Sequence, residues 1–121
     1  MEYLKLCDSD YRFMQVVWKY APIPSGELVK RCDQELGWKK STTYTMLKRL
    51  CERGIFQTEK GTVTALMTKA EFSAAQSEKF VEDTFEGSLP AFFAAFTTRK
   101  KLSKQEIDEI RQMIDSYGEE K

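Results

Sequence analysis

The chain has 121 residues, of which 41% are hydrophobic and 31% are charged, which fits a soluble globular protein and excludes a mostly disordered one. The longest apolar run, residues 89–96, is interrupted by Pro90 and is too short to cross a bilayer. The N-terminus lacks the pattern of a secretory signal, so we expect a cytoplasmic protein. The net charge is zero, but residues 1–69 carry 12 basic against 8 acidic side chains and residues 70–121 carry 7 against 11, which favours an anion-binding module followed by a module with another role.

Histidine is absent, and the three cysteines (Cys7, Cys32 and Cys51) form no CxxC or CxC pair. An odd number of widely spaced cysteines argues against a disulfide framework. Without histidine, the commonest metal ligand and the usual general base are both missing. The sequence also has no glycine-rich phosphate loop. We therefore expect buried or half-buried reduced thiols, no metal site, no cofactor and no catalytic centre.

Three short helices are predicted in the N-terminal half. The first follows the capping candidates Asp8-Ser9-Asp10 and ends at Pro22-Ile23-Pro24. The second is capped by Ser25 and ends at Gly37, and the third runs from Ser41 to about Arg53 before Gly54. Three short helices with tight connections favour a helix-turn-helix arrangement.

After the third helix the sequence pattern changes from one typical of a helix to one typical of strands. Residues 55–59 and 62–66 have the composition of two strands, and Lys60-Gly61 between them can form a tight turn. A two-stranded hairpin is not stable alone, so it must pack against the helices. The order of three helices and a hairpin predicts a winged helix over residues 1–68.

The tail, residues 69–121, is predicted to be helical throughout. Its last helix has a clear start signal, because Ser103 and Glu106 form an S-x-x-E capping box. Such apolar helices need a partner surface, which could be the N-terminal domain or the same helices of a second chain. We expect a dimerisation domain in a mainly α protein, with these residues at the interface: Phe80, Phe85, Leu89, Phe92, Phe93, Phe96, Ile107, Ile110 and Ile114.

The third helix carries the candidate site. Thr43, Met46, Leu47 and Leu50 share a stripe that would face the core. The remaining positions place hydroxyls near the helix N-terminus, where they can donate to phosphates or base edges. Basic residues flank them, and Lys60 lies at the hairpin tip. The candidate DNA-binding residues are Lys40, Ser41, Thr42, Tyr44, Thr45, Lys48 and Lys60.

These segments resemble the BlaI/MecI/CopY family of bacterial repressors, the penicillinase-repressor family. The first helix resembles the family's pattern in Tyr11-Arg12-Phe13-Met14-Gln15-Val16-Val17-Trp18. The third helix resembles the family's W-x3-T-x2-T-x-[LI]-x-R-L-x3-G segment, from Trp38 to Gly54. The tail resembles its G-[SG] … F … L-S-x-x-E stretch, from Gly87 to Glu106.

The resemblance implies a homodimer that binds an inverted-repeat operator with TACA/TGTA half-sites. It implies that Ser41, Thr42, Tyr44 and Thr45 read bases and that Lys48 and Lys60 contact the DNA backbone. It also implies a membrane sensor-protease system that cleaves the tail, here at Ala95–Phe96, although the family commonly has Asn where this chain has Ala95. The tail lacks the CxC pairs of the copper-responsive branch.

The leading hypothesis is thus a non-enzymatic, homodimeric transcriptional repressor that binds double-stranded operator DNA without a cofactor. The alternative is a winged-helix module that binds another protein through the third helix and the tail. An enzyme or metalloprotein is disfavoured by the absence of histidine.

Overall fold

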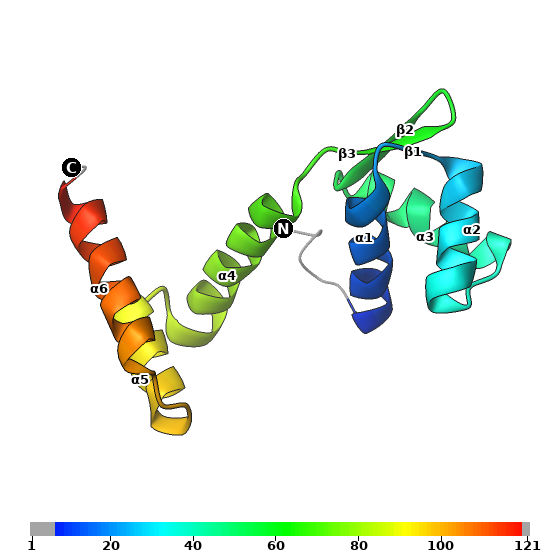
Figure 1. The fold of residues 1–121 in the computed structure, drawn as a ribbon. Coiled ribbons are helices and arrows are strands. Elements are labelled where there is room, and N and C mark those ends of the chain that lie inside the picture. The colour runs from blue at the N-terminus through cyan, green and yellow to red at the C-terminus, as the bar shows by residue number, and fades with distance from the viewer. Residues whose placement is uncertain (1–6, 120–121) are drawn as a thin grey trace. The chain divides into compact units, whose positions relative to one another are not determined.

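The computed structural model describes residues 7–119, and Figure 1 shows their helices and strands. The chain divides into two compact units between Lys79 and Phe80. The first unit contains α1 (Asp8–Tyr20), β1 (Ile23–Pro24), α2 (Ser25–Leu36), α3 (Lys40–Glu52), β2 (Phe56–Glu59), β3 (Thr62–Ala65) and the first part of α4 (Lys69–Phe85). The second contains the end of α4, α5 (Leu89–Arg99) and α6 (Lys104–Glu119).

The first unit is a winged helix, as the sequence predicts. β2 and β3 pair in antiparallel fashion through a two-residue turn, and β1 pairs with the other edge of β3, giving the strand order β1-β3-β2. The short strand β1 is a correction, because residues 22–24 were expected only to end a helix. Proline has no N–H to donate, and Pro24 is tolerated because β1 is an edge strand.

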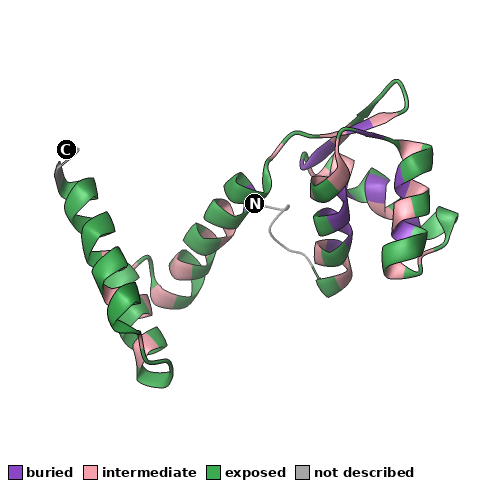
Figure 2. Ribbon diagram, in the orientation of Figure 1, coloured by how far each residue is buried: buried purple, intermediate pink, exposed green. Residues whose placement is uncertain are grey.

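The core of the first unit lies between α1, α2, α3 and the sheet. Its buried hydrophobic side chains include Phe13 and Val17 of α1, Leu28 of α2 and Phe56 of β2. Figure 2 shows that the buried residues of the described chain lie in this unit. Aromatic rings also pack in this core: Phe13 stacks on Trp38 with ring centroids 5.7 Å apart.

Several helix ends follow local signals, but the N-caps of α1, α2 and α3 do not. Gly37 adopts a left-handed φ of 69° after α2, and Ser103 and Glu106 form both hydrogen bonds of the predicted capping box. Ser25 does not cap α2 as predicted, because it is the first residue of the helix and Pro24 is the N-cap. In α1 the N-cap is Cys7 rather than one of the three predicted residues. Asp10 instead lies in the first turn and accepts the backbone N–H of Cys7.

The cysteines are free thiols, and two of the three match the expectation. Cys32 is fully buried, and burial raises the pKa of its thiol; Cys51 is half-buried. The expectation is wrong for Cys7, which is the N-cap of α1 and is exposed.

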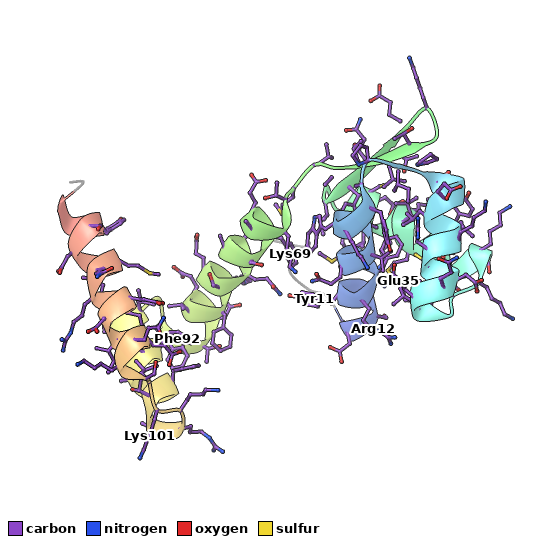
Figure 3. All side chains as sticks on the ribbon, viewed as in Figure 1. Tyr11, Arg12, Glu35, Lys69, Phe92 and Lys101 are labelled. Atoms are coloured by element: carbon purple, nitrogen blue, oxygen red, sulfur yellow. The ribbon has the colours of Figure 1, made fainter. Side chains whose placement is uncertain are left out.

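The second unit has no buried residue between Phe80 and Gly118. Phe92 of α5 packs its ring against Phe80 and Phe85, with centroids 6.0 and 5.6 Å apart (Figure 3). Ser88 caps α5 by accepting the N–H of Ala91 at 3.1 Å. Well-formed helices without a fully buried core leave much of their apolar surface in solvent.

Candidate nucleic-acid interface

α3 divides into a buried face and an exposed face, as its periodicity predicts. Thr43, Leu47 and Leu50 are buried in the core. The exposed residues include the candidates that the sequence placed on this helix, Ser41, Thr42, Tyr44, Thr45 and Lys48. Lys40, which the sequence placed just before the helix, is its first residue and is also exposed. The prediction that Met46 faces the core is only partly right, because Met46 is half-buried and lies at the border between the two faces.

The N-terminus of α3 begins without a side-chain cap. Its N-cap residue, Lys39, makes no capping hydrogen bond through its side chain. Its carbonyl oxygen accepts the backbone N–H of Thr43 at 3.1 Å and the hydroxyl of Thr43 at 3.3 Å. The first N–H groups of a helix have no partner within the helix, and together with the helix dipole they attract anions.

A shallow hollow of about 250 Å³ lies on the exposed face of α3, lined by Ser41, Thr42, Thr45, Met46 and Arg49. The hollow combines hydroxyl donors with an apolar thioether. Hydroxyls can contact either kind of base pair, and an apolar group can contact a thymine methyl. This mixture suits the major groove of DNA better than it suits a small polar ligand.

The basic residues around this face differ in whether an acidic side chain pairs with them. Lys39, Lys40 and Lys48 are exposed, and the Lys40 ammonium lies 6.0 Å from the centroid of the Tyr44 ring. Arg49 differs, because its guanidinium is ion-paired with Asp10 of α1 at 3.2 Å. Sequence reasoning missed this pairing.

Lys60 lies in the wing turn, as predicted, and is exposed. Lys60 and Gly61 both have positive φ, 51° and 77°, as a type I′ hairpin turn requires. The carbonyl oxygen of Gly61 accepts the backbone N–H of Ser25 at 2.8 Å. A backbone hydrogen bond therefore joins the wing turn to the first residue of α2.

The predicted dimerisation residues lie on the second unit with graded exposure. Leu89, Ile114, Phe80, Phe96 and Phe93 are exposed, with 63, 64, 50, 46 and 44% of their surface accessible. Phe85, Phe92, Ile107 and Ile110 are half-buried. A groove of about 580 Å³ between α5 and α6 is lined by Phe93, Ile107, Ile110 and Ile114 together with Thr97, Leu102 and the basic residues Lys100, Lys101 and Arg111.

The bond between Ala95 and Phe96 lies inside α5, and both residues are exposed. Their backbone is helical, whereas a protease needs an extended segment, so cleavage would require local unwinding of α5. Whether this bond is cleaved stays a prediction.

Comparison with known proteins agrees with the geometry. The sequence profile described as "Penicillinase repressor" matches residues 6–116. The penicillinase repressor of Bacillus licheniformis is 26% identical over 121 residues, covering 97% of this chain and 94% of the relative. The methicillin resistance regulatory protein MecI of Staphylococcus aureus is 18% identical over 115 residues, covering 92% of this chain and 94% of the relative. An uncharacterised 16.5 kDa protein of Latilactobacillus sakei is 23% identical over 114 residues, covering 91% of this chain and 78% of the relative.

Within residues 7–119, no helix is both long enough and apolar enough to cross a membrane. The profile match covers most of the chain, from the start of α1 to near the end of α6, and therefore includes both the winged helix and the helical tail. The chain belongs to the penicillinase repressor family, whose members are transcriptional repressors and not enzymes.

Proposed function

We propose that the chain acts in the cytoplasm as a homodimeric, sequence-specific repressor on an inverted-repeat operator. The observation that carries the proposal is the division of α3. The side chains of Thr43, Leu47 and Leu50 on one face are buried in the core. The opposite face exposes hydroxyl groups near a helix N-terminus that has no side-chain capping hydrogen bond. A rigid helix with such a face is suited to lie in the major groove.

In this proposal, Ser41, Thr42, Tyr44 and Thr45 read base edges, and Lys40, Lys48 and Lys60 bind phosphates. Lys40 begins α3, Lys48 lies further along the same helix, and Lys60 lies in the wing turn. Exposed lysines supply a salt-sensitive contribution to DNA binding that does not depend on base sequence. The tie between Gly61 and Ser25 supports the role of Lys60, because it holds the wing turn against the helix that precedes α3.

Dimerisation through residues 69–121 is supported by the second unit, whose apolar side chains are only half-buried or exposed between Phe80 and Gly118. A second copy of the same helices can cover this surface, since two-fold dimers are the commonest oligomers. A two-fold dimer places two copies of α3 on two half-sites of opposite orientation, so it matches a palindrome by symmetry.

We further propose that a membrane sensor-protease system relieves repression by cutting at Ala95–Phe96. The exposure of both residues and the family resemblance support this assignment. Separating the N-terminal part of the tail from α6 would remove apolar surface needed for pairing. Mass spectrometry of the chain from induced and uninduced cells tests it, and an intact chain after induction would contradict it.

The decisive experiment is fluorescence-anisotropy titration with a TACA/TGTA palindromic duplex and with a scrambled duplex of the same composition, repeated across salt concentrations. We expect a preference of roughly 10³-fold or more for the palindrome and a fall in affinity with salt. Equal, weak binding to both duplexes would contradict recognition of this sequence. Absence of binding at low salt would instead favour a protein-binding module.

A further inference from the structure

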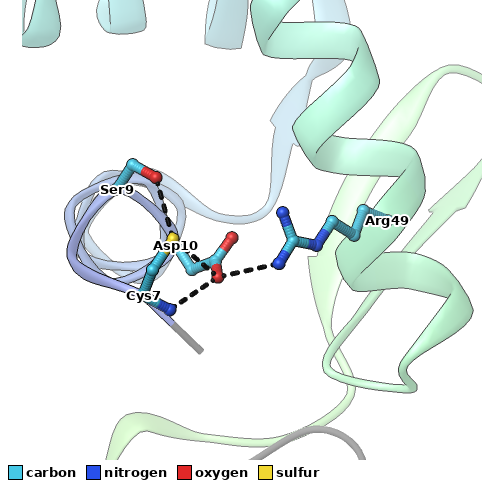
Figure 4. Close-up of polar contacts among 4 residues, drawn as sticks. All are labelled: Cys7, Ser9, Asp10 and Arg49. Atoms are coloured by element: carbon cyan, nitrogen blue, oxygen red, sulfur yellow. Dashed lines mark hydrogen bonds and ion pairs between the residues drawn. The ribbon is translucent and has the colours of Figure 1, made fainter. Parts of the chain in front are cut away.

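Asp10 is a fully buried carboxylate at the start of α1. Its Oδ2 atom accepts the backbone N–H of Cys7 at 2.9 Å, contacts the Cys7 thiol at 3.3 Å, and accepts a guanidinium N–H of Arg49 at 3.2 Å (Figure 4). Its Oδ1 atom is buried, and no donor among the described residues reaches it. The charge of Asp10 is therefore compensated chiefly by Arg49.

The two members of this ion pair differ sharply in exposure. The side chain of Asp10 is 0% accessible, whereas that of Arg49 is 43% accessible. A buried charge is held firmly by its one charged partner, because losing that partner would leave the charge without compensation. A guanidinium carries five N–H donors in a rigid plane, so one edge can be anchored while another faces solvent.

Arg49 also belongs to the proposed reading face. It follows Thr45 by four residues and Thr42 by seven, which places all three on one side of α3. The same three residues line the shallow hollow on that face. Asp10 thus anchors a cation beside the hydroxyls that are proposed to contact DNA.

We propose that Asp10 is a positioning residue for DNA binding, which holds the Arg49 guanidinium so that its exposed edge meets a DNA phosphate. The inference rests on the proposed function, since it assumes that this face of α3 binds DNA. An arginine that is ordered before it binds loses less conformational freedom on the DNA than a free one. The carboxylate therefore strengthens DNA binding, although its own charge repels DNA.

The direction in which DNA affinity changes when the Asp10 charge is removed distinguishes a positioning role from simple neutralisation of Arg49. Asp10→Asn keeps the size of the side chain and removes one negative charge. If Asp10 only neutralised Arg49, the variant would bind DNA more tightly. With a positioning role, we expect affinity for the TACA/TGTA palindrome to fall about fivefold or more, and the slope of log affinity against log salt to decrease by about one per subunit.

Asp8→Asn is the matched control. Asp8 lies in the same first turn of α1, carries the same charge and is exposed, and no contact with Arg49 is observed. Its removal should leave the affinity unchanged or slightly raised, with the slope unaltered. Arg49→Lys is a second variant that keeps both charges but loses the planar fork, and we expect it to weaken binding as Asp10→Asn does.

Each variant is measured at a temperature where circular dichroism shows it folded. Asp10→Asn and Arg49→Lys binding as well as Asp8→Asn would overturn the positioning role while leaving the proposed function intact. If Asp10→Asn does not fold, Arg49→Lys alone decides, since wild-type affinity in that variant would overturn the role. A wild-type chain that binds neither duplex at low salt would contradict the proposed function itself, and the inference with it.

Discussion

The indole N–H of Trp18 donates a hydrogen bond of 2.9 Å to the main-chain carbonyl oxygen of Met67, 49 residues further along the chain. Trp18 lies on α1, and Met67 lies in the segment that joins β3 to α4. The same indole ring packs against Phe56 and Phe72, with centroids 5.8 and 5.6 Å apart. The hydrogen bond to Met67 and the contact with Phe72 therefore anchor the start of α4 to α1, and the contact with Phe56 joins α1 to β2.

Replacing Trp18 by Phe keeps an aromatic ring but leaves the Met67 carbonyl without its donor. We expect a loss of about 2 kcal/mol in the free energy of unfolding, from the hydrogen bond and the smaller ring together. This corresponds to a fall in Tm of roughly 5–10 °C. Urea denaturation followed by circular dichroism measures the change.

Trp38→Phe is the control for the smaller ring, because Trp38 stacks on Phe13 and no hydrogen bond joins its indole to another residue between 7 and 119. The hydrogen bond to Met67 makes no net contribution if Trp18→Phe costs no more than Trp38→Phe.

Elements that depend on neighbouring residues were predictable from the sequence. The wing turn at Lys60-Gly61, the stop at Gly37 and the capping box at Ser103 follow from backbone preferences within a few residues. A second capping box, between Thr68 and Glu71, has the same T-x-x-E signal and was overlooked. It explains why α4 begins at Lys69.

Features that depend on distant partners were not predictable. β1 is a strand only because β3 lies beside it, and Pro22-Ile23-Pro24 alone indicates no more than a break. The exposed face of α3 followed from helical periodicity, but the pairing of Arg49 with Asp10 joins residues 39 positions apart. No local pattern distinguishes this arginine from the other basic residues of α3.

The two capping carboxylates give the helical tail a dependence on pH. Hydrogen bonds from the backbone N–H and the side chain of Thr68 lower the pKa of Glu71, and those from Ser103 lower the pKa of Glu106. A carboxyl whose folded pKa is depressed stabilises the fold above its unfolded pKa, and this contribution is lost as the pH falls through the folded pKa. We therefore expect α4 and α6 to weaken between about pH 5 and pH 3.

Glu106→Gln tests this dependence, because glutamine can still cap the helix but does not titrate. The variant should lose less stability than the wild type on acidification, as measured by urea denaturation at several pH values. Glu78→Gln on α4 is the control, since Glu78 lies beyond the first turn and is exposed. An equal effect of the two substitutions would contradict a capping origin.

Thr42 and Lys48 should affect DNA binding in different ways. Thr42→Val removes a hydroxyl without changing the shape of the side chain, and we expect the preference for the palindrome over the scrambled duplex to fall by about tenfold. Lys48→Ala should instead weaken both duplexes equally and reduce the salt slope by about one per subunit. Anisotropy titrations with both duplexes measure both effects. A uniform loss in Thr42→Val would reassign Thr42 to the DNA backbone.

The interface of the proposed dimer is best tested at Ile110. Phe92 is less suitable, because its ring packs against Phe80 and Phe85 of the same chain, so a charge there would disturb the subunit itself. Ile110 is half-buried and lines the groove between α5 and α6. A carboxylate at this position would have to be desolvated when a second copy covers the groove.

We expect Ile110→Asp to be monomeric in sedimentation experiments and to bind the palindrome at least about 100-fold more weakly, since the two half-sites are then bound independently. Gln112→Asp introduces the same charge two residues later, on the opposite side of α6, and should remain dimeric with wild-type affinity. Thermal unfolding of the winged helix should be the same in both variants, because its core contains neither residue. A monomeric Ile110→Asp with unchanged affinity would show that pairing through the tail is not needed for DNA binding, and a dimeric one would place the interface elsewhere on the tail.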